Sequence, residues 1–325
     1  MPEHLVVLSA SEPNPESVTF HVTERALFRE CRRKWQYQYA MNLEPVETGY
    51  SPLSFGTGIH KALQEYYIHD ANPVQIWNEW CAANPDQCDQ EASVLGQVML
   101  MNYHNYAQGA DRNWHPLEAE LEISAECPAL GVSLSGRIDL LIEDRKSGDL
   151  WIVDHKPYQF WLDDSKFEFD DQMTAYIWLA RRAGYNVKGA SVNQLRKKIP
   201  LVPAPLASGE LSKRKDIDTT WHIYQAQIQK HGLKESDYDD VRRTLLGDNR
   251  FFRRVNVYRS QSALASFEEN LFQELLDMSN PFLPIYPNFH RFCPSCRYAT
   301  LCRTETEGGD IESVIQSLYK KNTRT

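Results

Sequence analysis

Two strand-like runs joined by a short turn, at residues 132–158, constrain the fold more than any other part of the sequence. The first run reads VSLSGRIDLLIE and the second reads LWIVDHKPY. Both have the pattern of β-strands. The connecting residues RKSG, at 145–148, have the composition of a hairpin turn. We therefore expect an antiparallel hairpin whose second strand carries an aspartate, a histidine and a lysine near its end.

The position of the turn decides which charged residues of the hairpin face each other. A turn centred in the middle of RKSG pairs Asp139 with Asp154, whereas a turn centred one residue later pairs Asp139 with Lys156. Side chains alternate between the two faces of a strand, so Asp154 and Lys156 share one face in either register. Both registers therefore bring the three charged groups to one spot.

Carboxylates gathered in this way favour a metal site. Two carboxylates within a few ångströms repel each other unless a cation lies between them, and oxygen ligands of this kind suit Mg²⁺ or Mn²⁺. A neighbouring lysine can position or activate a water molecule and counter the charge on the transition state of phosphodiester hydrolysis. The hairpin alone leaves a second interpretation open, in which the charges form an ordinary salt-bridged turn.

Two helices are expected before residue 70. Thr23 is the expected N-cap of a helix through ALFRECRRKWQYQYA, with an inward stripe formed by Leu27, Cys31 and Trp35. Gly56-Thr57-Gly58 is expected to lead into a second helix, IHKALQEYYIH. That helix would carry His60 in its first turn.

The remaining elements follow from periodicity and from helix breakers. Helical patterns continue to about residue 108, with Pro73 and Pro85 as breaks. We expect a strand in LEAELEIS, a helix in DDQMTAYIWLARRAG that ends at Gly184, and a strand in VKGASVNQLR. Residues 200–219 are rich in Pro, Ser and Lys and are expected to form a loop. The region beyond is expected to be mainly helical.

Composition excludes several classes of protein. The chain has 325 residues, of which 42% are hydrophobic and 24% are charged, as in soluble globular proteins. It contains no apolar run long enough to span a bilayer, and MPEHLVVLSA lacks the features of a secretory signal, so we expect a cytoplasmic protein. A net charge of -9 argues against a protein that coats nucleic acid by bulk charge. Local basic clusters occur at Arg32-Arg33-Lys34, Arg196-Lys197-Lys198, Lys213-Arg214-Lys215 and Arg253-Arg254.

The seven cysteines are unevenly distributed. In a chain without an export signal, a disulfide framework is not expected. Cys293, Cys296 and Cys302 lie close together in HRFCPSCRYATLC, whereas Cys81, Cys88 and Cys127 are scattered. The close trio favours metal chemistry, and either tetrahedral zinc or an iron-sulfur cluster would need a fourth ligand from elsewhere in the chain.

Several of these pieces together resemble the RecB-like branch of the PD-(D/E)XK nuclease superfamily, which includes AddB-type and CRISPR-associated exonucleases and phage relatives. The matching pieces are GTGIH at 56–60, GRID at 136–139, VDHK at 153–156, QMTAY at 172–176 and the cysteines. They occur in the family's order and span residues 31–302. The resemblance implies an α/β fold with a restriction-endonuclease-like core, in which helices flank a mixed central sheet.

The resemblance also implies a domain organisation. Residues 1–116 would form an N-terminal helical region carrying Cys31 and His60, and residues 117–200 the nuclease core. Residues 201–325 would form a mainly helical C-terminal region with the cysteine cluster. We expect the three parts to pack as one compact domain.

Roles for individual residues follow from the same resemblance. His60 is similar to the family's active-site histidine, and Asp139 and Asp154 are similar to its two metal-binding carboxylates. The backbone carbonyl of His155 would be the adjacent metal ligand, and Lys156 would be the catalytic lysine. Gln172 and Tyr176 match a Q-x-x-x-Y motif that lies beside the active site and contacts DNA.

Two points depart from the family pattern or remain open. Many relatives have tyrosine where this chain has His155, and strand alternation points the side chain of His155 away from the metal. Glu120 or Glu122, on the preceding strand, would add a further carboxylate, and alternation does not choose between them.

The cysteines complete the resemblance. In iron-sulfur members of the family, a single cysteine far upstream supplies the fourth ligand, and Cys31 holds the matching position. The resemblance therefore implies a [4Fe-4S] cluster on Cys31, Cys293, Cys296 and Cys302, with Zn²⁺ as the alternative. Such a cluster would act as a structural clasp between the two ends of the chain.

The expected function is that of a metal-dependent DNA exonuclease that prefers single-stranded ends, in recombination, repair, replication or CRISPR-like processing. The sequence has no P-loop, so the protein would act on ends that are already single-stranded or that a helicase, recombinase or integrase partner supplies. The alternative is a catalytically weak DNA-binding accessory protein with a nuclease fold. Every catalytic position holds a competent residue, which favours the enzyme. The clusters at 196–198 and 213–215 are candidates for contacts with the DNA backbone.

Overall fold

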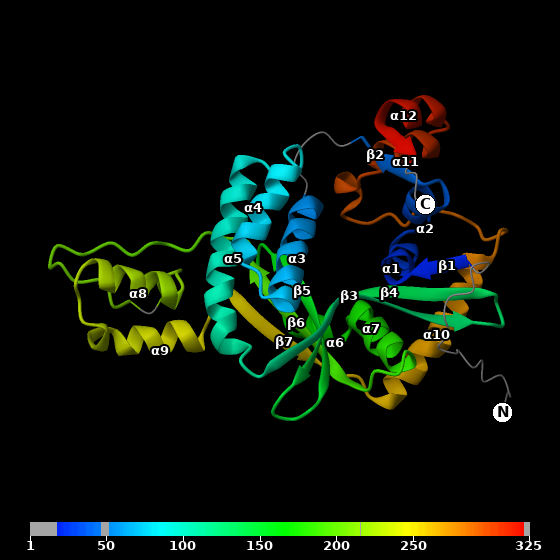
Figure 1. Cartoon of the computed structure of the whole chain (residues 1–325). Helices are drawn as coiled ribbons and strands as arrows, with labels where there is room; N and C mark the ends of the chain where they lie inside the picture. Colours follow the sequence, from blue (N-terminus) through cyan, green and yellow to red (C-terminus); the bar gives the residue numbers. More distant parts are fainter. Residues whose placement is uncertain (1–17, 47–51, 215, 322–325) are drawn as a thin grey trace.

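A computed structural model describes residues 18–46, 52–214 and 216–321. Its centre is a six-stranded mixed sheet flanked by helices, so the predicted fold class is confirmed (Figure 1). The strands are β1 (Val18–His21), β3 (Trp114–Cys127), β4 (Val132–Asp144), β5 (Leu150–Tyr158), β6 (Val187–Arg196) and β7 (Phe252–Val257). The first ten residues and Lys215, which enter the sequence predictions above, lie outside the described residues.

Strand β4 organises the sheet. One edge pairs along its length with antiparallel β3. The other edge pairs with parallel β1 over residues 132–135 and with antiparallel β5 over residues 140–143. On this second edge, residues 136–139 of β4 pair with neither β1 nor β5. Beyond β5, the sheet continues through parallel β6 to antiparallel β7.

The hairpin has the first of the two predicted registers. Leu140 pairs with Val153 and Glu143 pairs with Leu150. One step further along the same register, Asp139 faces Asp154, and there the ladder between β4 and β5 ends. The two aspartates therefore lie where the two strands separate, which leaves room for a ligand between them.

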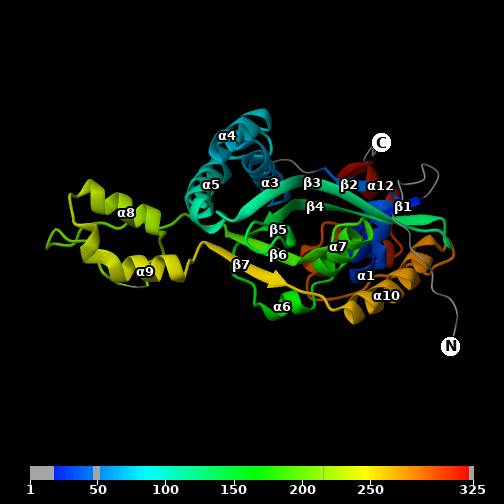
Figure 2. The same ribbon diagram turned by 60° about the horizontal axis from the view of Figure 1, so that its bottom comes forward.

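Helices cover both faces of the sheet (Figures 1 and 2). On one face, α1 (Val22–Glu30), α7 (Asp171–Arg182) and α10 (Gln261–Ser279) share an apolar core with the strands. The other face is covered by α3 (Pro52–His69), α4 (Pro73–Ala83) and α5 (Gln90–Ala110). The short helix α6 (Ser165–Glu168) lies between β5 and α7. Among the described residues, no helix is long and apolar enough to cross a membrane.

The prediction of one continuous helix after Thr23 was wrong. Helix α1 begins after His21 and ends at Glu30. The next residue, Cys31, has an extended backbone (φ -161, ψ 111) and interrupts the helix. Helix α2 (Arg32–Trp35) and a π-helical turn, η1 (Gln36–Ala40), follow. Cys31 therefore leaves the predicted inward stripe and lies partly exposed at the end of α1.

The predicted start of the second helix was also wrong. Helix α3 begins at Pro52, so the Gly-Thr-Gly motif lies inside it and His60 lies in its third turn. Gly58 has a packing role there, because a Cβ atom would come within 2.6 Å of the rings of Trp77 and Trp80. The motif thus lets α4 approach α3 closely.

Two further features were not predicted. A disulfide joins Cys81 and Cys88, whose Cα atoms are 5.3 Å apart across the turn between α4 and α5. The sequence analysis did not predict this disulfide, which is local because a turn brings the two cysteines together. Strand β7, in the region expected to be helical, forms the far edge of the sheet.

The two ends of the described chain pack together. Strand β2 (Leu43–Pro45) pairs with β8 (Tyr319–Lys321), and the Tyr298 hydroxyl donates to the Leu43 carbonyl at 2.7 Å. The C-terminal part contains η3 (Cys293–Ser295), α11 (Ala299–Thr306) and α12 (Ile311–Leu318). It shares a small apolar core with the segment that follows α1.

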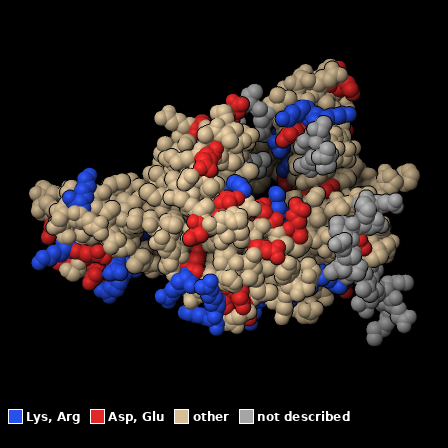
Figure 3. Space-filling view, viewed as in Figure 1, with Lys and Arg blue, Asp and Glu red and all other residues tan. Residues whose placement is uncertain are grey.

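An arm between β6 and β7 projects from the sheet (Figure 1). It contains α8 (Trp221–Lys230), η2 (Glu235–Tyr238) and α9 (Asp239–Gly247) around a core of its own. Acidic and basic residues are mixed on its surface (Figure 3). Arg196 and Lys198 both pair with Asp218, and Arg214 pairs with Asp216, so neighbouring aspartates offset much of the predicted basic charge.

Candidate active site

All six side chains that the sequence singled out around the hairpin line one cleft of about 460 Å³. They are His60 of α3, Asp139 of β4, Asp154 and Lys156 of β5, and Gln172 and Tyr176 of α7. The cleft opens where β4 and β5 separate. The first residues of α1 and the acidic residues of β3 complete its wall.

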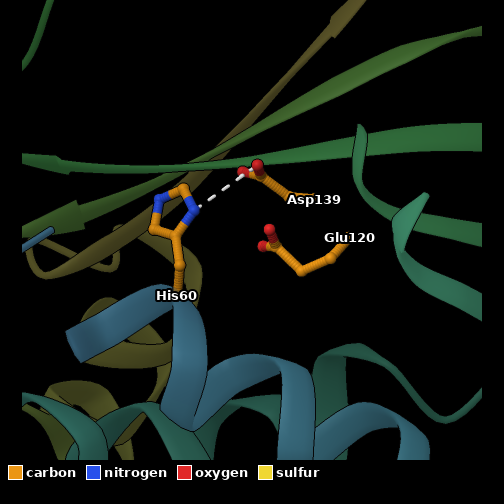
Figure 4. Close-up of side chains that lie close together, drawn as sticks. All are labelled: His60, Glu120 and Asp139. Atoms are coloured by element: carbon orange, nitrogen blue, oxygen red, sulfur yellow. Dashed lines mark ion pairs between the residues drawn. The ribbon is translucent and has the colours of Figure 1, made fainter. Parts of the chain in front are cut away.

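Three potential metal ligands converge in the cleft (Figure 4). Ligand atoms of His60, Glu120 and Asp139 all lie within 4.8 Å of one another. The Nδ1 atom of His60 is 3.4 Å from Oδ1 of Asp139, and Nε2 is 2.8 Å from the carbonyl oxygen of His155. A nitrogen and two carboxylates at this spacing suit a divalent cation that prefers oxygen ligands.

The structure distinguishes Glu120 from Glu122, which the sequence did not. Both line the cleft, but only Glu120 joins the trio with His60 and Asp139. Its backbone has φ +52, a left-handed value that costs free energy for a residue with a side chain. Glu120 also pairs with Arg137 at 3.1 Å. This unusual backbone has no sequence signal that we recognise.

A second set of contacts runs from Asp154 to the helix α7. The Lys156 ammonium lies 3.0 Å from Oδ1 of Asp154 and donates to Oε1 of Gln172 at 2.9 Å. The Gln172 amide nitrogen donates in turn to the Tyr176 hydroxyl at 3.1 Å. The two residues of the Q-x-x-x-Y motif therefore hold the lysine, a contact that the sequence analysis did not predict.

The two aspartates differ in their electrostatics. Burial raises the pKa of Asp154 to about 6, although Lys156 lowers it in part. Burial also raises the pKa of Asp139, but the hydrogen bond and charge of His60 outweigh it and bring the pKa to about 2. Burial lowers the pKa of Lys156, and the charges of Asp154 and Asp139 reverse that effect and raise it.

Asp154 retains an unsatisfied oxygen. Its side chain is 2% exposed, and Oδ2 has no hydrogen-bond partner in the described part of the chain. A buried carboxylate oxygen without a partner is costly, and a bound cation would remove that cost. The trio of His60, Glu120 and Asp139 therefore fits Mg²⁺ or Mn²⁺, and Asp154 lines the same cleft.

His155 contributes to the site through its backbone. Its N–H donates to Oδ2 of Asp139 at 2.7 Å. Its side chain lies on the opposite face of the sheet, as alternation predicted, where Nδ1 is 2.8 Å from the Asn193 amide and the ring stacks on Tyr67. Burial lowers the pKa of this ring to about 3. The carbonyl predicted as a metal ligand is the oxygen that faces Nε2 of His60.

The four predicted cluster cysteines also come together. Cys31, Cys293, Cys296 and Cys302 line a second cavity, of about 370 Å³. Backbone N–H groups point at two of the sulfurs, from Asn288 to Cys31 at 3.4 Å and from His290 to Cys293 at 3.3 Å. The four cysteines therefore share one cavity with backbone N–H groups, and hydrogen bonds of this kind occur around metal-bound sulfurs.

Helix α1 connects the two sites. Val22 and Thr23, at its start, line the catalytic cleft, and Cys31 follows its last residue, Glu30. Nine helical residues span about 13 Å.

Comparison with known proteins identifies one family. A family model described as the PD-(D/E)XK nuclease superfamily matches residues 19–303. No curated protein matches the chain. Among solved structures, the crystal structure of SSO0001 covers 89% of this chain and 87% of its own, with 12% sequence identity and a TM-score of 0.34. That likeness is too distant to carry information about function.

Proposed function

Because this chain belongs to the PD-(D/E)XK nuclease superfamily, whose members are metal-dependent nucleases, we propose that it is an exonuclease that degrades DNA from free single-stranded ends. The observation that most supports metal dependence is the unsatisfied buried oxygen of Asp154, a residue that lines the cleft in which His60, Glu120 and Asp139 converge. We assign the chain to the RecB-like, iron-sulfur branch of the superfamily. A helicase or recombinase partner would supply its single strands.

The proposed roles of the cleft residues follow from their contacts. His60, Glu120, Asp139 and Asp154 would hold Mg²⁺ or Mn²⁺, which when bound lowers the pKa of water and offsets phosphate charge. Lys156, fixed between Asp154 and Gln172, presents an ammonium group to the phosphate and counters the charge that develops on it. Tyr176 orients Gln172, and the backbone N–H of His155 orients Asp139.

The four cysteines would hold a [4Fe-4S] cluster. The alternative is that they hold a Zn²⁺ ion in the same cavity. A metal centre there joins α1 to α11, which are distant in sequence. It would reinforce the contacts that β2, β8 and Tyr298 already make. We propose a structural role for this centre, because no substrate-binding residue of the catalytic cleft lines its cavity.

Circular DNA tests the exonuclease proposal. We expect a linear end-labelled single strand to be degraded progressively in Mg²⁺ or Mn²⁺, because its end can enter the cleft. A covalently closed single-stranded circle of the same sequence should persist, since it offers no end. Gel analysis of both substrates in one reaction provides the measurement. Cutting of the circle and the linear strand at equal rates would show an endonuclease. That result would contradict the exonuclease proposal but not the proposed metal site.

A further inference from the structure

The segment after α10 exposes an unusual set of aromatic side chains. Phe282 is 90% exposed, Tyr286 53%, Phe289 67% and Phe292 59%. Phe289 and Phe292 line the cysteine cavity, whereas Phe282 and Tyr286 lie outside it. Single exposed apolar residues are common in soluble proteins, but neighbouring exposed rings in one short segment mark a binding surface. We call residues 281–292 the aromatic segment.

The aromatic segment carries no acidic side chain of its own. No Asp or Glu occurs between Asp277 and Glu305, although the whole chain carries a net charge of -9. The guanidinium of Arg32 lies over the Tyr286 ring at 5.3 Å, and that of Arg291 lies over the Phe292 ring at 4.7 Å. Two acidic groups lie beside the segment, because Asp277 pairs with Arg32 and Glu30 lies 3.9 Å from His290. Aromatic rings combined with neighbouring cations form the pattern that binds single-stranded nucleic acid through base stacking and phosphate attraction.

The backbone of the segment is restrained. Proline occurs at 281, 284 and 287, and proline fixes φ. Leu283 packs against the main core. Arg32 lies between two rings, at 5.2 Å from Phe28 and 5.3 Å from Tyr286, and pairs with Asp277 at 3.0 Å. The backbone of the segment and the Tyr286 ring are therefore held in place before a ligand binds, which lowers the entropic cost of binding.

The aromatic segment runs past the end of α1 (Figure 1). The Asn288 side-chain amide donates to the Glu30 carbonyl at 2.9 Å, at the C-terminal end of that helix. The other end of α1 borders the catalytic cleft. The helix spans about 13 Å, which corresponds to about four stacked nucleotides at 3.4 Å each.

We propose that the aromatic segment is a stacking platform for single-stranded DNA, a few nucleotides from the cleavage point. The proposal rests on the proposed function for the identity of the ligand. Bases of an unpaired strand expose their faces to Phe282 and Tyr286, whereas bases inside a duplex are already stacked. The platform, which lies away from the metal site, therefore favours binding of single-stranded over double-stranded substrate.

Binding measurements on Phe282→Ala and Tyr286→Ala test the platform. These two rings do not line the cysteine cavity, so metal content should equal that of the wild-type protein. In Ca²⁺, we expect fluorescence anisotropy to show single-strand binding about tenfold weaker for Tyr286→Ala and about a hundredfold weaker for the double variant. Binding of a blunt duplex should change little. Tyr286→Phe should bind like the wild type, whereas Tyr286→Leu, which keeps apolar area without an aromatic face, should not.

Tyr258→Ala is the matched control, because Tyr258 is 56% exposed and lies just beyond β7. It should bind single strands like the wild type. Wild-type affinity in the Phe282 and Tyr286 variants, with normal cleavage, would overturn the platform and leave the nuclease proposal standing. Wild-type affinity for single strands in Tyr286→Leu would also overturn it, because binding would then not require an aromatic face. A wild-type protein that neither binds nor cleaves DNA would instead overturn the proposed function.

Discussion

Replacing Asp154 with asparagine should lower the single-turnover rate of DNA cleavage by about a thousandfold or more. Asparagine has nearly the same shape but no charge, so the cleft loses a ligand and Lys156 loses its counterion. The fold should persist, because the substituted side chain fills the same buried space. Rapid-quench measurement of cleavage at saturating enzyme isolates this step from DNA binding.

Asp149→Asn is the control for that experiment. Asp149 precedes the first residue of β5 and lies 3.7 Å from Lys188, at the end of the strand away from the cleft. Its replacement removes the same charge about 16 Å from Asp154 and should leave the rate unchanged. Full activity in Asp154→Asn at wild-type metal concentrations would refute the catalytic assignment.

Replacing Cys31 with serine should remove the metal centre and lower the thermal unfolding temperature. The proposed cluster would join α1 to the C-terminal helices, so its loss would remove a cross-link between distant parts of the chain. The paired strands β2 and β8 and the hydrogen bond from Tyr298 remain, so the central sheet should stay folded. Anaerobic wild-type protein should be brown, with about four irons per chain.

Cys127→Ala serves as the control for iron content. Cys127 is fully buried in the main core and does not line the cysteine cavity, so the variant should keep its iron even if packing is weakened. A colourless wild-type preparation with one zinc per chain would refute the iron-sulfur cluster. It would still be consistent with a structural metal that links the two ends of the chain. Iron retained in Cys31→Ser would show that Cys31 is not a ligand.

Much of the catalytic cleft could be predicted because it depends on local rules. The turn at 145–148 fixes the register of the hairpin, and alternation then places Asp139, Asp154 and Lys156 on one face. Spacing on one helix likewise brings Gln172 and Tyr176 together. These relations involve residues close in sequence, for which backbone geometry alone determines the contacts.

The remaining features depend on tertiary contacts or on backbone geometry without a sequence signature. The break at Cys31 occurs inside a sequence with good helical periodicity, and it directs the cysteine to a cavity formed by residues far along the chain. The left-handed backbone conformation of Glu120 likewise has no signal in the sequence. Strand β7 was missed because its sequence, FRRVNV, carries charged residues that suit an edge strand.

The most direct test of the central claim is a time course of wild-type protein on end-labelled single-stranded DNA, with Mg²⁺, Mn²⁺ or EDTA. The four proposed ligands in the cleft predict shortening of the strand in either metal and no cleavage in EDTA, with activity restored when excess metal is added back. Cleavage that continues at the same rate in EDTA would contradict a metal-dependent site, as would intact DNA in both metals.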